Sequence, residues 1–385
     1  MKILILLLVA LISATIAFAV NWLALIPWRR AKDQHWTEEA RVYHPVRTGA
    51  VSNLLVIPAV LVLVAVAWNK ADLPSWIFIA LFSSIGVLIG TMPMDREVFP
   101  RITMSDLLRQ AATGSFFRLL SYFVFLGAAA LMPNEFNLQV PSILSAVILL
   151  WVFWSRELWL RVASKIGYLQ SPPDRLQRIV NDCANQMNVA VRETWVLRFP
   201  VAQAFALPGT RKLLFTEHLL ELLTDEELAT ICSHELGHLT EKRGQYLKRY
   251  IILLTYLPWL LFKPMIHNFG ALGFFILLGT TILVPKISRK FSHKLEMRAD
   301  EMAKTNEGDP GVYARALERL HRDALLPAVV AKEQLTHPHL YDRLLAAGVT
   351  PDYPRPKPAS SMAWNGWFFA MAVGALAALL ILSKH

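Results

Sequence analysis

The chain reads TDEELATICSHELGHLT from residue 224 to residue 240. Thr224, with a glutamate three residues later, has the pattern of a helix capping box, and the carboxylates of the first turn suit the positive end of a helix dipole. A helix that begins here carries His234 and His238 on one face, one turn apart. Two imidazoles so placed can coordinate one metal ion, and Glu235 lies beside them. The stretch therefore predicts a helix that carries a His-Glu-x-x-His metal motif.

A second segment offers a candidate for a third ligand. Residues 293–300 read HKLEMRAD and are predicted to be helical, which places Glu296 and Asp300 on one face. Catalytic zinc usually takes three protein ligands and keeps an open fourth position, so Glu296 could complete the set. Asp300 could accept a hydrogen bond from a liganding imidazole and so fix its tautomer. The alternative is that Glu296 pairs with Lys294 or Arg298 on a solvated helix face, and the residues alone leave this choice open.

The chain is apolar for its length of 385 residues, with 55% hydrophobic residues and a mean hydropathy of +0.39. Its apolar residues gather in runs about as long as a helix needs to cross a bilayer. We expect the first run to be retained rather than cleaved as a signal peptide, because it continues past residues 17–19 and ends in two arginines. The sixth and seventh runs are short and adjoin prolines, so we expect them to be tilted, kinked or paired in a hairpin. Seven or eight spans are predicted, at residues 4–27, 51–68, 74–92, 119–132, 141–154, 250–262, 269–284 and 362–382.

Basic residues in alternate loops predict the orientation of these spans. The loops after the first, third and fifth runs are basic, whereas the loops between them carry almost no cation. The positive-inside rule then places residues 156–250 and 286–361 in the cytoplasm. The net charge of +10 is accounted for in this way, and no basic patch interleaved with aromatic residues suggests nucleic-acid binding.

The motifs together resemble the membrane metallopeptidase family M48, which contains the heat-shock protease HtpX and the CaaX prenyl proteases. The resemblance begins with HELGH at 234–238, followed by an apolar hairpin and EMRAD at 296–300. Upstream, FALPG at 205–209 resembles the family's segment before the zinc helix. Downstream, His337-Pro338 and Arg343 resemble its His-Pro motif and following arginine. The similar region runs from residue 199 to residue 344.

This resemblance implies one zinc ion per chain, a general base that acts on a zinc-activated water, and hydrolysis of peptide bonds. It also implies an edge strand that pairs with the substrate backbone, although the family commonly has asparagine where this chain has Gln203. The implied zinc ligands are His234, His238 and Glu296, and the implied general base is Glu235. Asp300 would hydrogen-bond to a liganding histidine, and His337 or Arg343 would stabilise the oxyanion. The implied substrate strand contains Gln203, Ala204, Phe205 and Ala206.

We therefore expect a mainly α-helical polytopic membrane protein with a cytoplasmic-side gluzincin-type α+β metallopeptidase domain. The expected parts are a membrane region (1–159) with about five spans, a peptidase domain (160–350) interrupted by an apolar hairpin (250–285), a proline-rich linker (351–361) and a last span (362–385). The expected location is a bacterial inner membrane or, less favoured, the endoplasmic reticulum membrane.

The expected function is that of a zinc endopeptidase, and its partners are a protein or peptide substrate and the lipid bilayer. Two alternatives stay open, namely CaaX-type processing of lipidated carboxyl termini and a non-catalytic membrane scaffold with a zinc site. Glu235 argues against the scaffold, because a purely structural site needs no general base. A transporter ranks last, since no span carries a convincing pair of charges. The sequence does not predict an oligomeric state.

Overall fold

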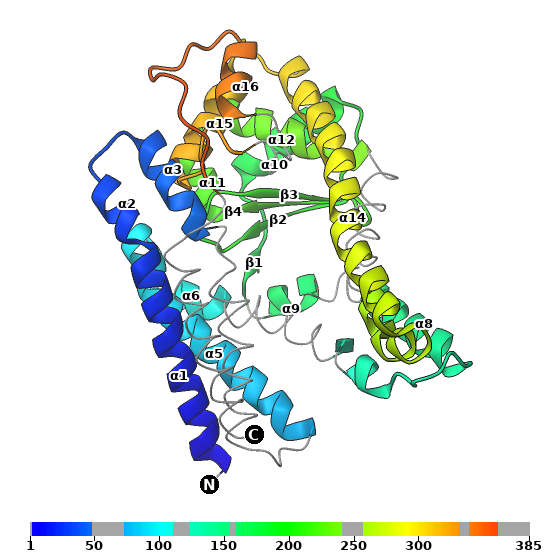
Figure 1. Cartoon of the computed structure of the whole chain (residues 1–385). Helices are drawn as coiled ribbons and strands as arrows, with labels where there is room; N and C mark the ends of the chain where they lie inside the picture. Colours follow the sequence, from blue (N-terminus) through cyan, green and yellow to red (C-terminus); the bar gives the residue numbers. More distant parts are fainter. Residues whose placement is uncertain are drawn as a thin grey trace. The chain divides into compact units, whose positions relative to one another are not determined.

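The computed structural model describes residues 2–47, 73–110, 124–125, 127–153, 159–165, 167–240, 257–331 and 339–360 (Figure 1). The chain divides into two compact units. The first comprises residues 1–112, 325–331 and 353–385, and the second comprises residues 113–324 and 332–352. The predicted spans at 51–68 and 362–382 lie outside the described residues, and those at 119–132, 141–154 and 250–262 lie partly outside them.

The first unit is built on two long apolar helices, α1 (Lys2–Ala24) and α5 (Leu73–Val98), which pack along each other. Their backbones come close at Gly86 and Gly90, where an added Cβ would lie 2.1 and 2.3 Å from carbonyl oxygens of α1. The hydroxyls of Ser13 and Ser83 share a buried hydrogen bond of 2.9 Å across this contact. Close approach at small residues spaced four apart, together with interhelical hydrogen bonds, is how helices associate in lipid. The other helices of the unit are α2 (Ile26–Ala31), α3 (Trp36–Arg47) and α6 (Met104–Gln110).

The second unit contains a small sheet of β1 (Leu169–Gln170), β2 (Glu193–Leu197), β4 (Lys212–Thr216) and β3 (Ala204–Leu207), in that order across the sheet. The central pair β2 and β4 is parallel, and the outer pairs are antiparallel. Strand β3 therefore forms one edge among the described strands. All five residues of β4 are buried, as expected for a central strand.

Helices cover this sheet and form the core of the unit with it. These are α10 (Asp174–Gln186), α11 (Glu217–Leu222), α12 (Asp225–Thr240) and α15 (Val312–Asp323), and the short α16 (Leu340–Ala346) packs against α15. Leu213, Phe215 and Leu236 are fully buried in the shared core, which also holds Cys183 and Cys232. The capping box of α12 forms as predicted, because the Thr224 N–H donates to Oε2 of Glu227 at 3.0 Å and the Glu227 N–H donates to Oγ1 of Thr224 at 3.3 Å.

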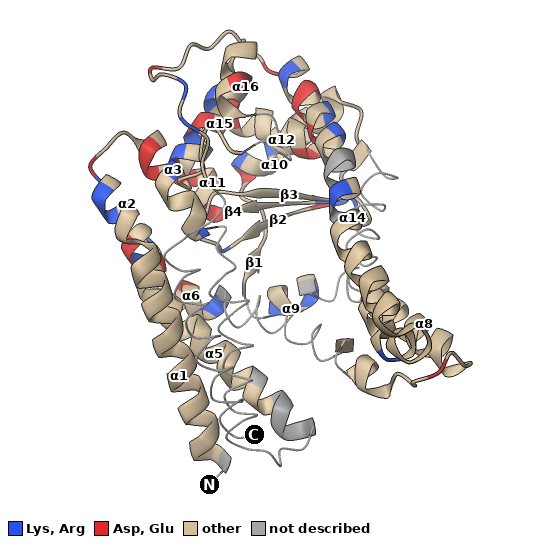
Figure 2. Ribbon diagram, viewed as in Figure 1, with Lys and Arg blue, Asp and Glu red and all other residues tan. Residues whose placement is uncertain are grey.

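The remaining elements of this unit are mostly apolar, although the cations Arg161 and Lys165 lie among them (Figure 2). They are α8 (Gln139–Phe153), α9 (Trp159–Lys165), η3 (Leu257–Leu261) and the first half of α14 (Phe262–Thr305). Charged residues are frequent instead on α15 and the second half of α14.

Among the described residues, two stretches are long and apolar enough to cross a membrane, Ile3–Ala31 and Leu257–Val284. The second stretch is not one straight rod, because Gly270 has a non-helical backbone with φ of 54°. The indole N–H of Trp259 donates to the Thr281 hydroxyl at 2.7 Å, although the two residues are 22 positions apart. A Cβ on Gly273 would lie 2.3 Å from the carbonyl oxygen of Met265. The chain thus reverses at Gly270, and its two legs lie side by side.

Candidate metal centre

The centre lies where α12 meets α14. Gly237 is the contact point, since an added Cβ there would lie 3.2 Å from Cα of Ala299 and 3.4 Å from Sδ of Met302. This close approach puts the inner face of α12, with His234 and His238, against the turn of α14 that carries Glu296. All three side chains are buried. The helical i, i+4 spacing predicted from the sequence is therefore the spacing that builds the site.

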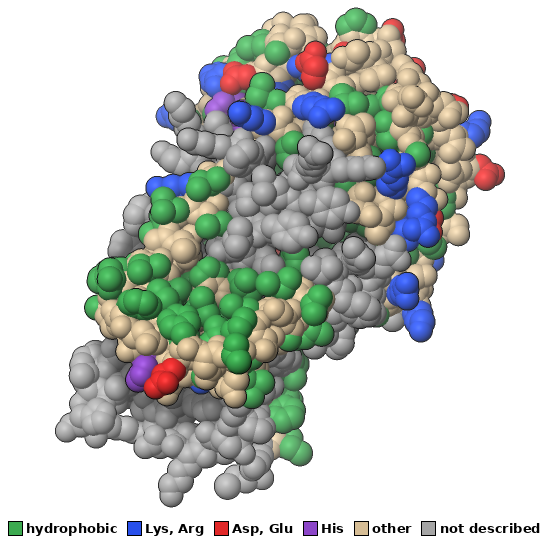
Figure 3. Space-filling view, turned by 90° about the vertical axis from the view of Figure 1, so that its right-hand side faces the viewer, with side chains coloured by type: hydrophobic (Ala, Val, Ile, Leu, Met, Phe, Trp, Pro, Cys, Tyr) green, Lys and Arg blue, Asp and Glu red, His purple; other side chains and the backbone are tan. Residues whose placement is uncertain are grey.

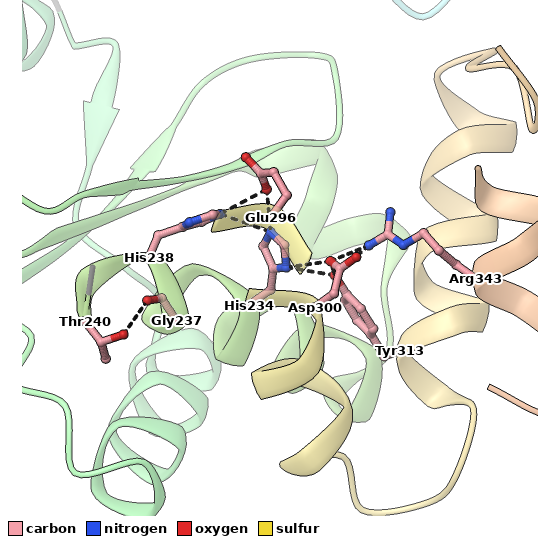
Figure 4. A network of polar contacts seen from close by, with 8 residues as sticks. All are labelled: His234, Gly237, His238, Thr240, Glu296, Asp300, Tyr313 and Arg343. Carbon is pink, nitrogen blue, oxygen red and sulfur yellow. Dashed lines mark hydrogen bonds and ion pairs between the residues drawn. The ribbon is translucent and has the colours of Figure 1, made fainter. Parts of the chain in front are cut away.

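The ligand atoms of His234, His238 and Glu296 converge (Figure 4). The two Nε2 atoms are 3.2 Å apart, and Oε2 of Glu296 lies 3.3 Å from Nε2 of His238 and 3.6 Å from Nε2 of His234. Tetrahedral zinc with bonds of about 2.0–2.1 Å holds neighbouring ligand atoms about 3.3–3.4 Å apart. The three measured separations bracket that value, so the residues fit a zinc ion. The competing interpretation, in which Glu296 lies on an exposed face, does not fit its burial.

Residues 170–348 match the sequence profile of peptidase family M48. These residues form an M48 domain. The family implies metal-dependent proteolysis, so the chain is a peptidase of the metal-dependent class. The match covers the sheet, the helices of the core and all three converging side chains.

Behind the three converging ligand side chains of the M48 domain lies a second layer of polar contacts. The Tyr313 hydroxyl lies 2.8 Å from Nδ1 of His234 and donates to Oδ1 of Asp300 at 2.7 Å. Oδ1 of Asp300 is itself 3.2 Å from Nδ1 of His234. Arg343, on α16, donates from Nη2 to Asp300 at 2.5 Å and to the Tyr313 hydroxyl at 2.9 Å. A tyrosine hydroxyl that donates to Asp300 can only accept from Nδ1, so the proton of neutral His234 sits on Nδ1 and its Nε2 is left free for a metal.

Electrostatics in this layer follow from burial and from these contacts. Burial alone would lower the pKa of His234, but hydrogen bonds to Asp300 and Glu296 and the charge of Glu235 raise this pKa to about 9. Burial would raise the pKa of Asp300, but the hydrogen bond from His234 and the charge of Arg343 hold it below its usual value. Burial raises the pKa of Tyr313 well above that of a free phenol, so its hydroxyl keeps the proton that it donates. Without a metal, therefore, His234 is a cation at neutral pH.

Glu235 is buried in the same turn of α12, and within the described parts of the chain its carboxylate has no hydrogen-bond or ion-pair partner. A carboxylate that is mostly enclosed and has no partner among the described residues is available to bind a ligand or a water, or to take part in chemistry. Nδ1 of His238 is likewise buried and has no partner among the described residues. His337 falls outside the described residues. Arg343 contacts Asp300 and Tyr313. These contacts lie on the Nδ1 side of His234 rather than on its Nε2 side.

The predicted substrate strand forms one of the two edges of the sheet among the described strands. Strand β3 packs beside α12, and the N–H of Thr216 donates to the carbonyl of Gln203 at 2.9 Å. Because bonding alternates along an antiparallel pair, Phe205 also bonds to β4, whereas the N–H and C=O groups of Ala204 and Ala206 point away from the sheet. Two backbone positions beside the metal motif are thus left for an added strand.

Sequence reasoning missed two residues of this site. Tyr313 carries no motif, because its place in the network depends on the packing of α15 against α12. Gly237 lies inside the quoted motif, and a glycine inside a helix is a signal of close packing that could have been read.

Proposed function

We propose that the M48 domain is a zinc-dependent endopeptidase that hydrolyses peptide bonds of membrane or membrane-associated proteins. His234, His238 and Glu296 would hold one zinc ion per chain. The observation that carries this proposal is the convergence of three buried ligand atoms at the separations of a tetrahedral zinc site.

Zinc in such a site lowers the pKa of a bound water towards about 7 and polarises the scissile carbonyl. The work of the protein's own groups is to place and move protons. Glu235, buried and without a partner in the described structure, would accept a proton from the attacking water and return it to the leaving amine. Asp300 would hold His234 in the Nδ1–H tautomer. His337, or those N–H groups of Arg343 that Asp300 and Tyr313 do not use, would donate to the oxyanion.

The substrate would bind as an added strand. Ala204 and Ala206 on β3 offer outward N–H and C=O groups, and an extended peptide that pairs with them runs along α12. Gln203 and Phe205 flank these positions, and the half-exposed Phe205 ring offers an apolar contact for a substrate side chain. Backbone pairing of this kind recognises any extended segment, which suits an enzyme that cuts unfolded chains.

The membrane assignment rests on two apolar helical stretches and on the α1–α5 contact through small residues. We place the catalytic groups on the cytoplasmic side because of the loop charges. A multi-pass protein of a bacterial inner membrane fits these features best.

The test compares wild type with Glu235→Gln in detergent, by zinc content per chain and by cleavage of an unfolded membrane protein with and without a chelator. Glu226→Gln is the matched control, because Glu226 is exposed in the first turn of the same helix. We expect about one zinc in all three proteins and chelator-sensitive cleavage by wild type and the control only. A wild type that takes up no zinc when supplied with it would refute the metal site, and cleavage by Glu235→Gln would refute the assigned base.

A further inference from the structure

One helix connects the apolar hairpin to the candidate zinc ligand. Beyond the reversal at Gly270, α14 runs as a helix to Thr305 without a second break, and Glu296 lies on this continuous part. Figure 1 shows it as a single rod that starts at the hairpin and ends beside α12. A continuous helix rises about 1.5 Å per residue. The distance along the helix between any point of the hairpin's second leg and Glu296 is therefore fixed by counting residues.

The surface of the hairpin marks where a bilayer would lie. Hydrophobic side chains gather over α8 and the first half of α14 (Figure 3), and Leu272, Phe275 and Leu283 are each about 60% exposed, at 62, 63 and 59%. An apolar surface of this kind on a folded protein indicates contact with lipid or a partner. Along α14 it ends near Lys286, the first cation after the hairpin, which is exposed and is followed by further basic residues. Lysine at the end of an apolar helix places its ammonium group at the membrane–water interface.

The count from this boundary gives the height of the site. Glu296 lies ten positions after Lys286, which corresponds to about 15 Å along the helix axis. The usual tilt of membrane helices, about 20°, changes this height by only about 1 Å. The headgroup layer accounts for about 5–7 Å on each side of the hydrocarbon. The catalytic groups would then lie above the headgroups rather than within the bilayer.

We infer that α14 acts as a spacer that selects membrane-anchored substrates by the distance of the scissile bond from the bilayer. This inference rests on the proposed function, in which the hairpin lies in the membrane and the substrate binds β3 as an extended strand. An extended chain spans at most about 3.3–3.6 Å per residue, so about five residues are needed to bridge 15 Å. The substrate class is thus a membrane protein or anchored protein with a free cytoplasmic segment of at least about five residues before the cut.

The same distance disfavours the alternative function, processing next to a lipid-modified cysteine. A bond adjacent to the lipidated residue could reach the site only if the lipid chain left the bilayer. Withdrawal costs about 0.8 kcal/mol per methylene group. Loose or unfolded cytoplasmic tails meet no such cost, because the polypeptide itself bridges the distance.

The experiment uses the full-length protein in phospholipid vesicles with a set of single-span substrates. Each substrate carries the same cleavable segment, separated from its membrane span by a flexible spacer of about zero, two, five, eight or twelve residues. A soluble peptide with the cleavable segment reports the competence of the active site, and a peptide with a farnesylated cysteine at the scissile bond tests the lipid alternative. Glu235→Gln vesicles control for contaminating proteases, and mass spectrometry locates each cut.

The expected result is cleavage of the soluble peptide and of the anchored substrates with about five or more spacer residues, with at least a tenfold loss of rate at two residues or fewer. Equal rates for all spacers, or efficient cleavage beside the farnesylated cysteine, would overturn the inference and leave the peptidase assignment intact. If the soluble peptide is not cut either, the proposed function itself fails and the inference falls with it.

Discussion

Tyr313→Phe tests the second layer of the site, because it removes one oxygen atom and leaves the ring in the core. That oxygen has three polar contacts of 2.7–2.9 Å, with Asp300, His234 and Arg343. Loss of a group that orients a metal ligand typically costs 10–100-fold in metal affinity. Asp300 still lies 3.2 Å from Nδ1 of His234 in the variant, so the tautomer keeps one acceptor. We therefore expect the lower end of that range, about tenfold weaker zinc binding, or about 1.4 kcal/mol.

The assay is competition for zinc against a fluorescent chelator at pH 7.5, together with thermal unfolding of the metal-free protein. The matched control is Tyr43→Phe, which removes a buried tyrosine hydroxyl from the first unit. A double variant with Arg343→Gln is expected to be less than additive, since Arg343 touches Tyr313 directly. Unchanged zinc affinity in Tyr313→Phe, or an equal loss in Tyr43→Phe, would show that the hydroxyl does not orient His234.

Four further predictions concern the same domain. Zinc affinity is expected to rise about tenfold per pH unit between about pH 7 and 9 and then to level off. The reason is that zinc must displace the proton of His234, whose pKa is raised to about 9. Competition with a chelator across this pH range measures the zinc affinity. By the same linkage, the metal-free protein is stabilised by protonated His234 below about pH 6.5, and this contribution disappears as the pH rises through 9. Gly237→Val is expected to separate α12 from α14. It should lower zinc affinity, and it should lower the unfolding free energy by about 1–3 kcal/mol. Gly279→Val is the control, because an added Cβ there meets nothing within 4 Å. Ala206→Pro is expected to raise KM for peptide substrates at least several-fold with zinc content unchanged, because it removes an N–H group that points away from the sheet. Phe205→Pro, by contrast, is expected to break a hydrogen bond to β4 and to destabilise the fold.

Each of these predictions has a result that would contradict it. A zinc affinity independent of pH below 8 would mean that His234 is not protonated in the metal-free site. Equal effects at Gly237 and Gly279 would point to general intolerance of valine in these helices rather than to a specific contact. An unchanged KM in Ala206→Pro would remove β3 from substrate binding.

Local patterns made the centre of the site predictable. The capping box at Thr224 and the i, i+4 pairs on α12 and α14 depend only on helical geometry, which is the same in every helix. The small-residue spacing of Gly86 and Gly90 is equally local, although which helix packs there cannot be read from it. The sequence therefore predicts the faces of α12 and α14 that carry the candidate ligands. It does not predict the contact at Gly237 that brings these two faces together.

Residues whose role depends on tertiary packing were not predictable in the same way. Tyr313 is separated from His234 by 79 positions and lies on an amphipathic helix where an aromatic residue is ordinarily a core residue. Arg343 was predicted near the oxyanion, and that role stays a prediction; its hydrogen bond from Nη2 to Asp300 is a further contact that no motif indicates. No spacing rule distinguishes these positions, because each is set by how α15 packs onto α12 and α16 onto α15.

Charge balance explains why these groups belong together. Glu235, Glu296 and Asp300 are buried carboxylates, and Arg343 is a buried cation that pairs with Asp300. With His234 neutral, the cluster keeps two uncompensated negative charges, which a low-dielectric interior tolerates poorly. A proton on His234 offsets one of them, which is the physical cause of its raised pKa. A divalent cation offsets both and releases that proton, so the cluster is electrostatically complete only with a doubly charged metal bound.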